Sequence, residues 1–169
     1  MKLYFKPGAC SMASHIILNE TNKQFELEKT DTETGLTESG ENFLEVNPNG
    51  YVPALKTSSG EIITENPAIL QFIGDSVPDK NLTPQDDPLA RTRLHEILNF
   101  ISSELHKSYG PFFSGEALDE QAQQTTKKKY TKKLPTSKIK SKTDETIYSV
   151  TPSPSQMLMP LLCLIGQTS

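Results

Sequence analysis

One cysteine stands where a predicted strand passes into a predicted helix. Cys10 follows the alternating segment 2–6 and a Pro-Gly turn, and it precedes residues 12–22, whose apolar side chains recur with helical spacing. Free N–H groups at a helix N-terminus favour a thiolate, so this position predicts a lowered thiol pKa and a reactive sulfur. Residue 13 is Ala13, so the second thiol of a dithiol redox motif is missing. An inert buried cysteine is the alternative.

Further candidate residues lie at the starts of other predicted elements. Glu65 and Asn66 stand at the start of a predicted helix, where they could form an N-capping pair and where the helix end could receive an anion. Ser11 is a possible N-cap of the first helix. Val52 and Pro53 lie between a turn and a predicted strand, and on the residues alone Pro53 is interpreted as an ordinary proline at the start of that strand.

A third group lies on one predicted helix. Asn99, Ser103 and His106 are four and three residues apart, which places them on one face of an α-helix. A carboxamide, a hydroxyl and an imidazole on one face are unusual for a helix that only packs in a core. The alternatives are an interhelical histidine and, for the neighbouring Lys107, a surface lysine.

The elements that must position these residues follow a regular order. Strands are predicted at residues 2–6 and 25–31, after the turn in NPNGYVPALKT, and at 61–64; helices are predicted at 12–22, 64–77 and 89–109. Residues 32–42 predict a polar loop followed by a short helix. The order is β-α-β-(α)-β-β-α, followed by a long helix.

Composition excludes several classes of protein. The chain has 169 residues, of which 34% are apolar, and only two are cysteines, Cys10 and Cys163. Two cysteines exclude a disulfide framework and a Cys-rich zinc module. The start of the chain lacks the apolar stretch of a signal peptide, and the longest apolar run, residues 157–165, is too short to span a membrane. We therefore expect a reduced, cytoplasmic protein with no metal and no membrane partner.

Charge divides the chain into two parts. Residues 127–169 carry eight lysines against two acidic residues, or +6, whereas residues 1–126 carry nine basic against nineteen acidic residues, or −10; the net charge is −4. A basic tract can bind nucleic acid, but this one has no arginine and few aromatic residues on which bases could stack. A solvated tail with no nucleic-acid partner is the preferred interpretation.

Four separated segments together resemble the bacterial beta-class glutathione transferases. They are MKLYFKPGACSMASHIIL, NPNGYVPAL, ENPAILQFIGDSVPD and NFISSELHKSYGPFF, and the resemblance runs from residue 1 to about residue 120. It implies an α/β thioredoxin-like N-terminal domain (βαβαββα) followed by an incomplete all-α C-terminal domain. The implied boundaries are a glutathione-binding domain at 1–80, a linker at 81–88, the start of the helical domain at 89–125 and an aberrant tail at 126–169. The family is usually homodimeric.

The resemblance also implies where glutathione, as co-substrate, would bind. Pro53 would be a cis-proline, so that Val52 offers its backbone N–H and C=O to the cysteinyl part of glutathione. Glu65 would receive the α-ammonium of the γ-glutamyl part, and Asn66 with the helix end would hold its α-carboxylate. The family often has a basic residue for the glycyl carboxylate where this chain has Gly35.

The resemblance assigns the remaining candidates to the reacting sulfur. Cys10 would form a mixed disulfide with glutathione, Ser11 would hydrogen-bond its thiolate, and His106 would donate a hydrogen bond or tune the thiol. These three are the catalytic candidates. The other candidates are glutathione-binding residues on the long helix: Asn99, Ser103 and Lys107.

Residues 126–169 depart from the family. Family members continue with a GDxFTIADAY-like segment, which this sequence does not show. Suitable codons for VTPSPSQMLM, at residues 150–159, encode DTFTIADAY when they are translated two bases further on. We therefore hypothesise that the chain is frameshifted from a point between residues 126 and 146, which truncates the helical domain. An intact frame at the locus, with homologues that encode SVTPSPSQ, would contradict this.

The preferred function is glutathione transfer, in which the glutathione thiolate attacks a small electrophilic molecule. Two alternatives remain open: a glutathione-dependent thiol–disulfide reductase centred on Cys10, and an inactive, decayed transferase fragment or interaction module. No further cofactor is expected.

Overall fold

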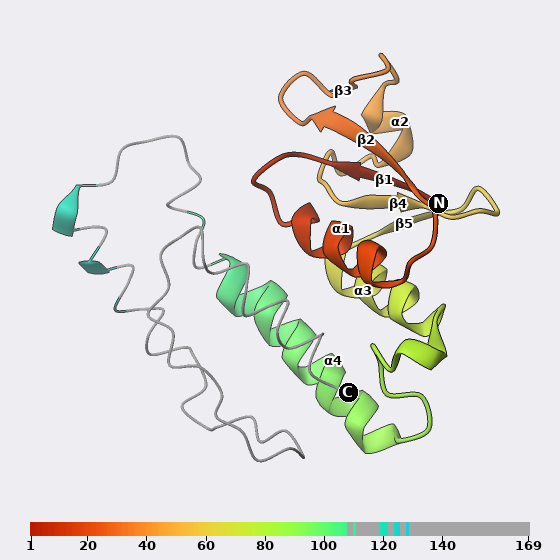
Figure 1. Cartoon of the computed structure of the whole chain (residues 1–169). Coiled ribbons are helices and arrows are strands. Elements are labelled where there is room, and N and C mark those ends of the chain that lie inside the picture. Colours follow the sequence, from red (N-terminus) through yellow and green to blue (C-terminus); the bar gives the residue numbers. More distant parts are fainter. Residues whose placement is uncertain (108–109, 111–118, 122–123, 126–127, 129–169) are drawn as a thin grey trace. The chain divides into compact units, whose positions relative to one another are not determined.

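The computed structural model describes residues 1–107, 110, 119–121, 124–125 and 128 (Figure 1). These residues form two compact units, Met1–Gln85 and a second unit that begins at Asp86. The division falls within the predicted linker, and each unit is described by itself. The frameshift hypothesis, the lysine tract apart from Lys128, and Cys163 concern residues outside the described ones.

The first unit is built on one mixed sheet. Its strands are β1 (Lys2–Phe5), β2 (Glu26–Asp31), β3 (Leu36–Thr37), β4 (Ala54–Lys56) and β5 (Ile62–Thr64). Their order is β3-β2-β1-β4-β5, in which β1 and β2 pair in parallel and the other pairs are antiparallel. Its helices are α1 (Ser11–Glu20), α2 (Phe43–Val46), α3 (Asn66–Asp75) and the 3-10 turn η1 (Pro78–Lys80). The predicted order is confirmed, and β3 is an addition to it.

The missed strand β3 lies in the segment predicted as a loop. Its two residues pair with Thr30 and Asp31 of β2. Gly35 makes the reversal between the strands, with φ at +72°, a backbone conformation that favours glycine. A strand of two residues has no alternation of its own, so the polar, glycine-containing sequence gave no strand signal.

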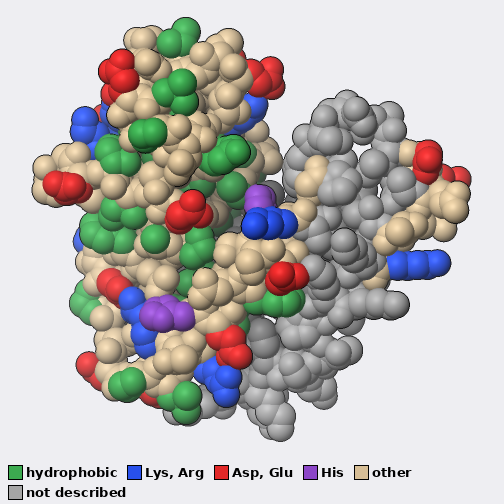
Figure 2. Space-filling model, turned by 180° about the vertical axis from the view of Figure 1, so that it is seen from behind, with side chains coloured by type: hydrophobic (Ala, Val, Ile, Leu, Met, Phe, Trp, Pro, Cys, Tyr) green, Lys and Arg blue, Asp and Glu red, His purple; other side chains and the backbone are tan. Residues whose placement is uncertain are grey.

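The core follows from the alternation of side chains along β1 and β4. Tyr4 and Ala54 pack with Phe43 of α2, and all three are completely buried. Successive strand residues point to opposite faces, so Leu3 and Leu55 are buried on the other face, where α1 and α3 lie side by side (Figure 1). Leucine and isoleucine at helical spacing supply the large apolar side chains on the buried faces of these helices. Apolar side chains also remain among the charged ones on the surface seen from behind (Figure 2).

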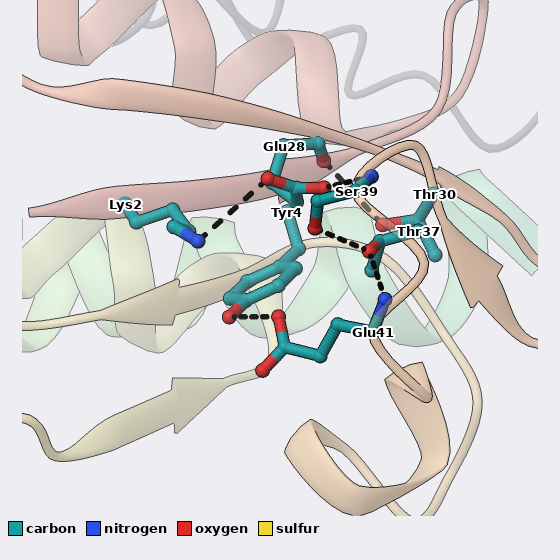
Figure 3. Close-up of polar contacts among 7 residues, drawn as sticks. All are labelled: Lys2, Tyr4, Glu28, Thr30, Thr37, Ser39 and Glu41. Carbon is teal, nitrogen blue, oxygen red and sulfur yellow. Dashed lines mark hydrogen bonds and ion pairs between the residues drawn. The ribbon is translucent and has the colours of Figure 1, made fainter.

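A polar cluster links the segment that follows β3 to strands β1 and β2 (Figure 3). The Tyr4 hydroxyl donates to Glu41 at 3.0 Å, and Lys2 lies 3.6 Å from Glu28, which accepts from the Ser39 backbone N–H at 3.0 Å. Burial, followed by the nearby Glu41 carboxylate, raises the pKa of Tyr4 to about 12. The neutral phenol is therefore kept as a hydrogen-bond donor far above neutral pH.

The second unit begins with α4 (Pro88–Phe100), which continues as the π-helical segment η2 (Ile101–His106). The Asp87 carboxylate caps α4 by accepting from the N–H groups of Leu89 and Ala90. The prediction of one α-helix at 89–109 is wrong in its second part. The hydroxyls of Ser102 and Ser103 both donate to the Asn99 carbonyl. In an α-helix this carbonyl accepts from a backbone N–H, so the hydroxyls compete with the backbone where the turn widens. Within the described ranges, no helix has the length and apolar character needed to cross a bilayer.

A methyl group at Gly74 is expected to clash with the segment after η1. A Cβ there would lie 2.6 Å from the Thr83 Cγ2, and Thr83 is buried and held by its hydroxyl on Asp75. Overpacking costs about 1–3 kcal/mol and alanine regains about 1 kcal/mol of helix propensity. We therefore expect Gly74→Ala to lower the free energy of unfolding by about 1 kcal/mol in urea titrations.

Thr83→Ser is the matched background, because it removes Cγ2 and keeps the hydroxyl. In that background Gly74→Ala is expected to become neutral or stabilising. An equal loss in both backgrounds would contradict the close approach as the cause.

Candidate functional site

The structure brings Cys10 and Val52 together, although they are 42 residues apart. The Cys10 Sγ donates to the Val52 carbonyl oxygen at 3.5 Å. The peptide bond between Val52 and Pro53 is cis, so the cis-proline implied by the resemblance is confirmed and the interpretation of an ordinary proline is wrong. The thiol therefore lies against the backbone edge at which the cysteinyl part of glutathione is expected.

The predicted direction of the Cys10 pKa is wrong. Burial raises the pKa of the Cys10 thiol, and the negative charge of Glu65 raises it further. The backbone N–H groups of Cys10 and Ser11 act in the opposite direction, as expected at a helix start, but they do not prevail. Cys10 is the N-cap of α1 rather than a residue within its first turn. The rise in pKa caused by desolvation of the sulfur is therefore larger than the fall caused by the N–H groups at the helix start.

The raised pKa can be tested by alkylation. In a Cys163→Ser background, Cys10 is the only thiol, and its reaction rate with iodoacetamide follows the thiolate fraction. We expect the midpoint of the pH profile to lie above the ordinary cysteine range. Glu65→Gln removes a charge that raises the pKa, so it should shift the midpoint to lower pH.

Glu61→Gln is the control for this shift, since Glu61 is another exposed acid and is not among the groups that act on Cys10. If the protein that retains Glu65 has an alkylation midpoint at or below the ordinary cysteine range, the conclusion that desolvation raises the Cys10 pKa is contradicted.

Ser11 does not cap α1. Its side chain is completely buried, and its hydroxyl donates to the Lys6 carbonyl and accepts from the Lys6 backbone N–H, both at 3.2 Å. Cys10 occupies the cap position and makes no side-chain cap hydrogen bond. The N-cap interpretation is therefore wrong, whereas the hydrogen bond from Ser11 to a bound thiolate stays a prediction.

The start of α3 is also uncapped by side chains. Glu65 is its N-cap residue, is exposed, and has φ 65° and ψ 113°. The carboxamide of Asn66 turns to α1 instead, where Nδ2 donates to the Cys10 carbonyl at 2.8 Å and Oδ1 accepts from Ser14 at 2.6 Å. The interpretation as an N-capping pair is thus wrong. The structure nevertheless brings Asn66 to Cys10.

Sequence reasoning missed Ser14. It is completely buried between the apolar residues Ala13 and Ile17 of α1. A polar residue on the inward face of an amphipathic helix needs a hydrogen-bond partner, and this was the signal that could have found it.

The candidates on the long helix are exposed and belong to the second unit. The Asn99 Nδ2 donates to the His95 carbonyl at 2.9 Å, and the Ser103 hydroxyl donates to the Asn99 carbonyl at 2.8 Å. The expected common face assumed α-helical spacing, but Ser103 and His106 lie in the wider turn η2. The roles of these two residues, and those of Asn99 and Lys107, stay predictions.

The described residues contain no group of three or more potential metal ligands of the His, Cys, Asp or Glu type. The groups that the structure gathers at the site are the Cys10 thiol, the exposed Glu65 carboxylate, the Val52 backbone and the N-termini of α1 and α3. Such a set suits a zwitterionic peptide-like ligand, because the carboxylate can meet an ammonium and the helix ends an anion.

Known proteins are similar to this chain in sequence. Residues 1–75 match the family model described as glutathione S-transferase, N-terminal domain. Glutathione S-transferase GstA of Escherichia coli O157:H7 is 44% identical over 120 residues, which cover 71% of this chain and 60% of that protein. Glutathione S-transferase GST-4.5 of Xanthomonas campestris is 37% identical over 117 residues, which cover 69% of this chain and 55% of that protein. The chain thus spans little more than half the length of these relatives.

Solved structures give the same result. A sphingomonad glutathione S-transferase complexed with glutathione is 46% identical, with a TM-score of 0.72, over 78% of this chain and 65% of that chain. A bacterial beta-class enzyme from Sphingomonas chungbukensis has the same identity, TM-score and coverage. The expected thioredoxin-like α/β fold of the N-terminal region is confirmed. Residues 1–75 therefore belong to the family of glutathione S-transferase N-terminal domains.

Proposed function

We propose that the first unit binds glutathione and that the protein transfers it to a small electrophilic molecule. The observation that supports this best is the contact of the Cys10 thiol with the Val52 carbonyl, next to the start of α3. Support also comes from the 46% identical sphingomonad enzyme, whose structure is a complex with glutathione. A homodimer and a cytoplasmic location belong to the same proposal and rest on the family.

Each part of glutathione meets a group of suitable chemistry in this proposal. The backbone of Val52 pairs with the cysteinyl amide groups, which places the glutathione sulfur near Cys10. The Glu65 carboxylate receives the α-ammonium. The N-terminus of α3 receives the α-carboxylate, because a helix N-terminus carries partial positive charge.

The reaction needs the glutathione sulfur as a thiolate. The thiolate forms a bond to the electrophilic carbon of the second substrate, the leaving group departs with its bonding electrons, and the thiol proton goes to water or a basic group. Ser11 is proposed to hydrogen-bond the thiolate. The roles that the resemblance gives to His106, Asn99, Ser103 and Lys107, which belong to the second unit, stay predictions.

Thiol–disulfide exchange is the second candidate, because a cysteine thiol stands at the site. The Cys10 thiolate attacks glutathione disulfide, forms a mixed disulfide and releases one glutathione thiolate. No change in net oxidation state is needed, since one disulfide replaces another.

A thermal melt with S-methyl glutathione tests glutathione binding. This thioether cannot form a mixed disulfide, so it reports binding alone. We expect a cooperative melt whose Tm rises with ligand, by the equivalent of about 2.7 kcal/mol at a hundred times Kd. Glu65→Ala should remove the rise, and the exposed Glu61→Ala should keep it. A cooperative melt indifferent to the ligand would overturn the proposal in favour of a folded, non-catalytic protein, and the absence of a cooperative transition would favour the decayed fragment.

A further inference from the structure

The first residue of α3 reaches across to the start of α1. The Asn66 Nδ2 donates to the Cys10 carbonyl oxygen at 2.8 Å, and Oδ1 accepts from the Ser14 hydroxyl at 2.6 Å. A carbonyl oxygen can only accept, so exchanging the nitrogen and oxygen of the amide would set two acceptors against each other. The partners therefore determine the orientation of the carboxamide, and both its ends are engaged.

The partners of Asn66 are withdrawn from water. Ser14 has no exposed surface, and Cys10 is half-buried. Most other buried residues of α1 and α3 are apolar and could pack the helices together without a polar bridge: Ala13, Ile17, Leu18, Ile69, Leu70 and Ile73. The hydrogen bonds of Asn66 lie at the end of the helix pair that carries the thiol, so they fix the position of the Cys10 backbone relative to α3.

Asn66 restrains groups on both of its sides. It holds the carbonyl of Cys10, a cap residue that makes no side-chain cap hydrogen bond of its own. It also directly follows Glu65, whose φ of 65° and ψ of 113° are strained for a residue with a side chain. Such a conformation persists only where its surroundings hold it, and the anchored Asn66 is its nearest restraint.

We propose that Asn66 is a positioning residue that fixes Cys10 and Glu65 relative to each other. Its side chain acts through these two residues, because both ends of the carboxamide are engaged within the protein. The part that concerns glutathione affinity rests on the proposed function above. The part that concerns the Cys10 thiol does not, because the hydrogen bond of the thiol to Val52 lies within the protein.

The test compares Asn66→Ala with Ser14→Ala in a Cys163→Ser background. Ser14→Ala is the matched control, because it removes one hydrogen bond of the bridge and keeps the one to Cys10. For Asn66→Ala we expect about tenfold weaker binding of S-methyl glutathione, the loss that corresponds to one hydrogen bond to a buried group. We also expect a faster plateau rate of iodoacetamide alkylation, reached where the thiol is fully ionised, because the start of α1 is no longer anchored and the sulfur becomes more accessible.

Ser14→Ala should lower Tm and leave both readouts within about twofold of the parent protein. Asn66→Ser, which keeps a hydroxyl at the helix start but is too short to bridge both partners, replaces Asn66→Ala if that variant fails to fold. Unchanged affinity and alkylation in the Asn66 variants, or equal changes in Ser14→Ala, would overturn the proposal. If the parent protein itself does not bind S-methyl glutathione, the proposed function fails, and the alkylation rates alone decide the role of Asn66.

Discussion

Truncation of Phe43 to alanine is expected to lower the free energy of unfolding by about 3–5 kcal/mol. The Phe43 side chain is completely buried, and its ring lies 5.6 Å from the ring of Tyr4, centroid to centroid. The Phe43 ring packs α2 against Tyr4 and Ala54 on one face of the sheet, and Val52 packs against the same three residues. A loss of this size is a large part of the stability of a typical domain, so we expect an early urea midpoint or a protein unfolded at room temperature.

Leu44→Ala is the matched control, because Leu44 is the next residue of α2 and is 50% exposed. Its truncation should change the free energy of unfolding by no more than about 0.5 kcal/mol. Similar losses in the two variants would show that α2 contributes through its backbone and not through the Phe43 ring.

Replacement of Cys10 by serine is expected to abolish thiol–disulfide exchange at the site. The hydroxyl cannot form a disulfide, so incubation with glutathione disulfide should no longer add a glutathionyl group to this position. The backbone of Val52 and the Glu65 carboxylate are unchanged, so the affinity for S-methyl glutathione should stay within about twofold. Peptide mass spectrometry and calorimetry measure the two effects.

The comparison needs Cys163→Ser as its control, since Cys163 is the other thiol of the chain. That variant should retain glutathionylation at Cys10. Continued turnover of disulfide substrates by Cys10→Ser would exclude Cys10 as the exchanging thiol, whereas retained conjugation activity would separate transfer from exchange.

The element order of the first unit could be predicted because its signals are local. Pro67 in the first turn of α3 and the Gly60 turn between β4 and β5 are sequence features with a direct conformational cause. The two-residue β3 and the π-helical η2 could not be predicted. The first depends on pairing with β2, and the second on which carbonyl the hydroxyls of Ser102 and Ser103 select.

Features of the site could be predicted where a residue type restricts the backbone conformation. They could not be predicted where the packing of distant segments determines a pKa or a hydrogen-bond partner. A cis peptide bond occurs almost only before proline, so the resemblance together with Pro53 predicted the cis bond between Val52 and Pro53. The pKa of Cys10 depends on how many atoms of distant segments surround the sulfur, which no local pattern reports. The partners of Asn66 are likewise set by the packing of α1 against α3.

Gly35 bears on how this protein could be redesigned. Gly35 has a φ of +72°, and its carbonyl accepts a hydrogen bond from the Phe43 backbone N–H, so it lies at the tight reversal between β2 and β3. Installing the family's basic side chain by a single exchange would force that side chain into a conformation disfavoured by its own Cβ. An engineer seeking a cation for the glycyl carboxylate would have to rebuild the loop or recruit a lysine from another segment. The same restriction narrows the mutational routes open to natural variants of this turn.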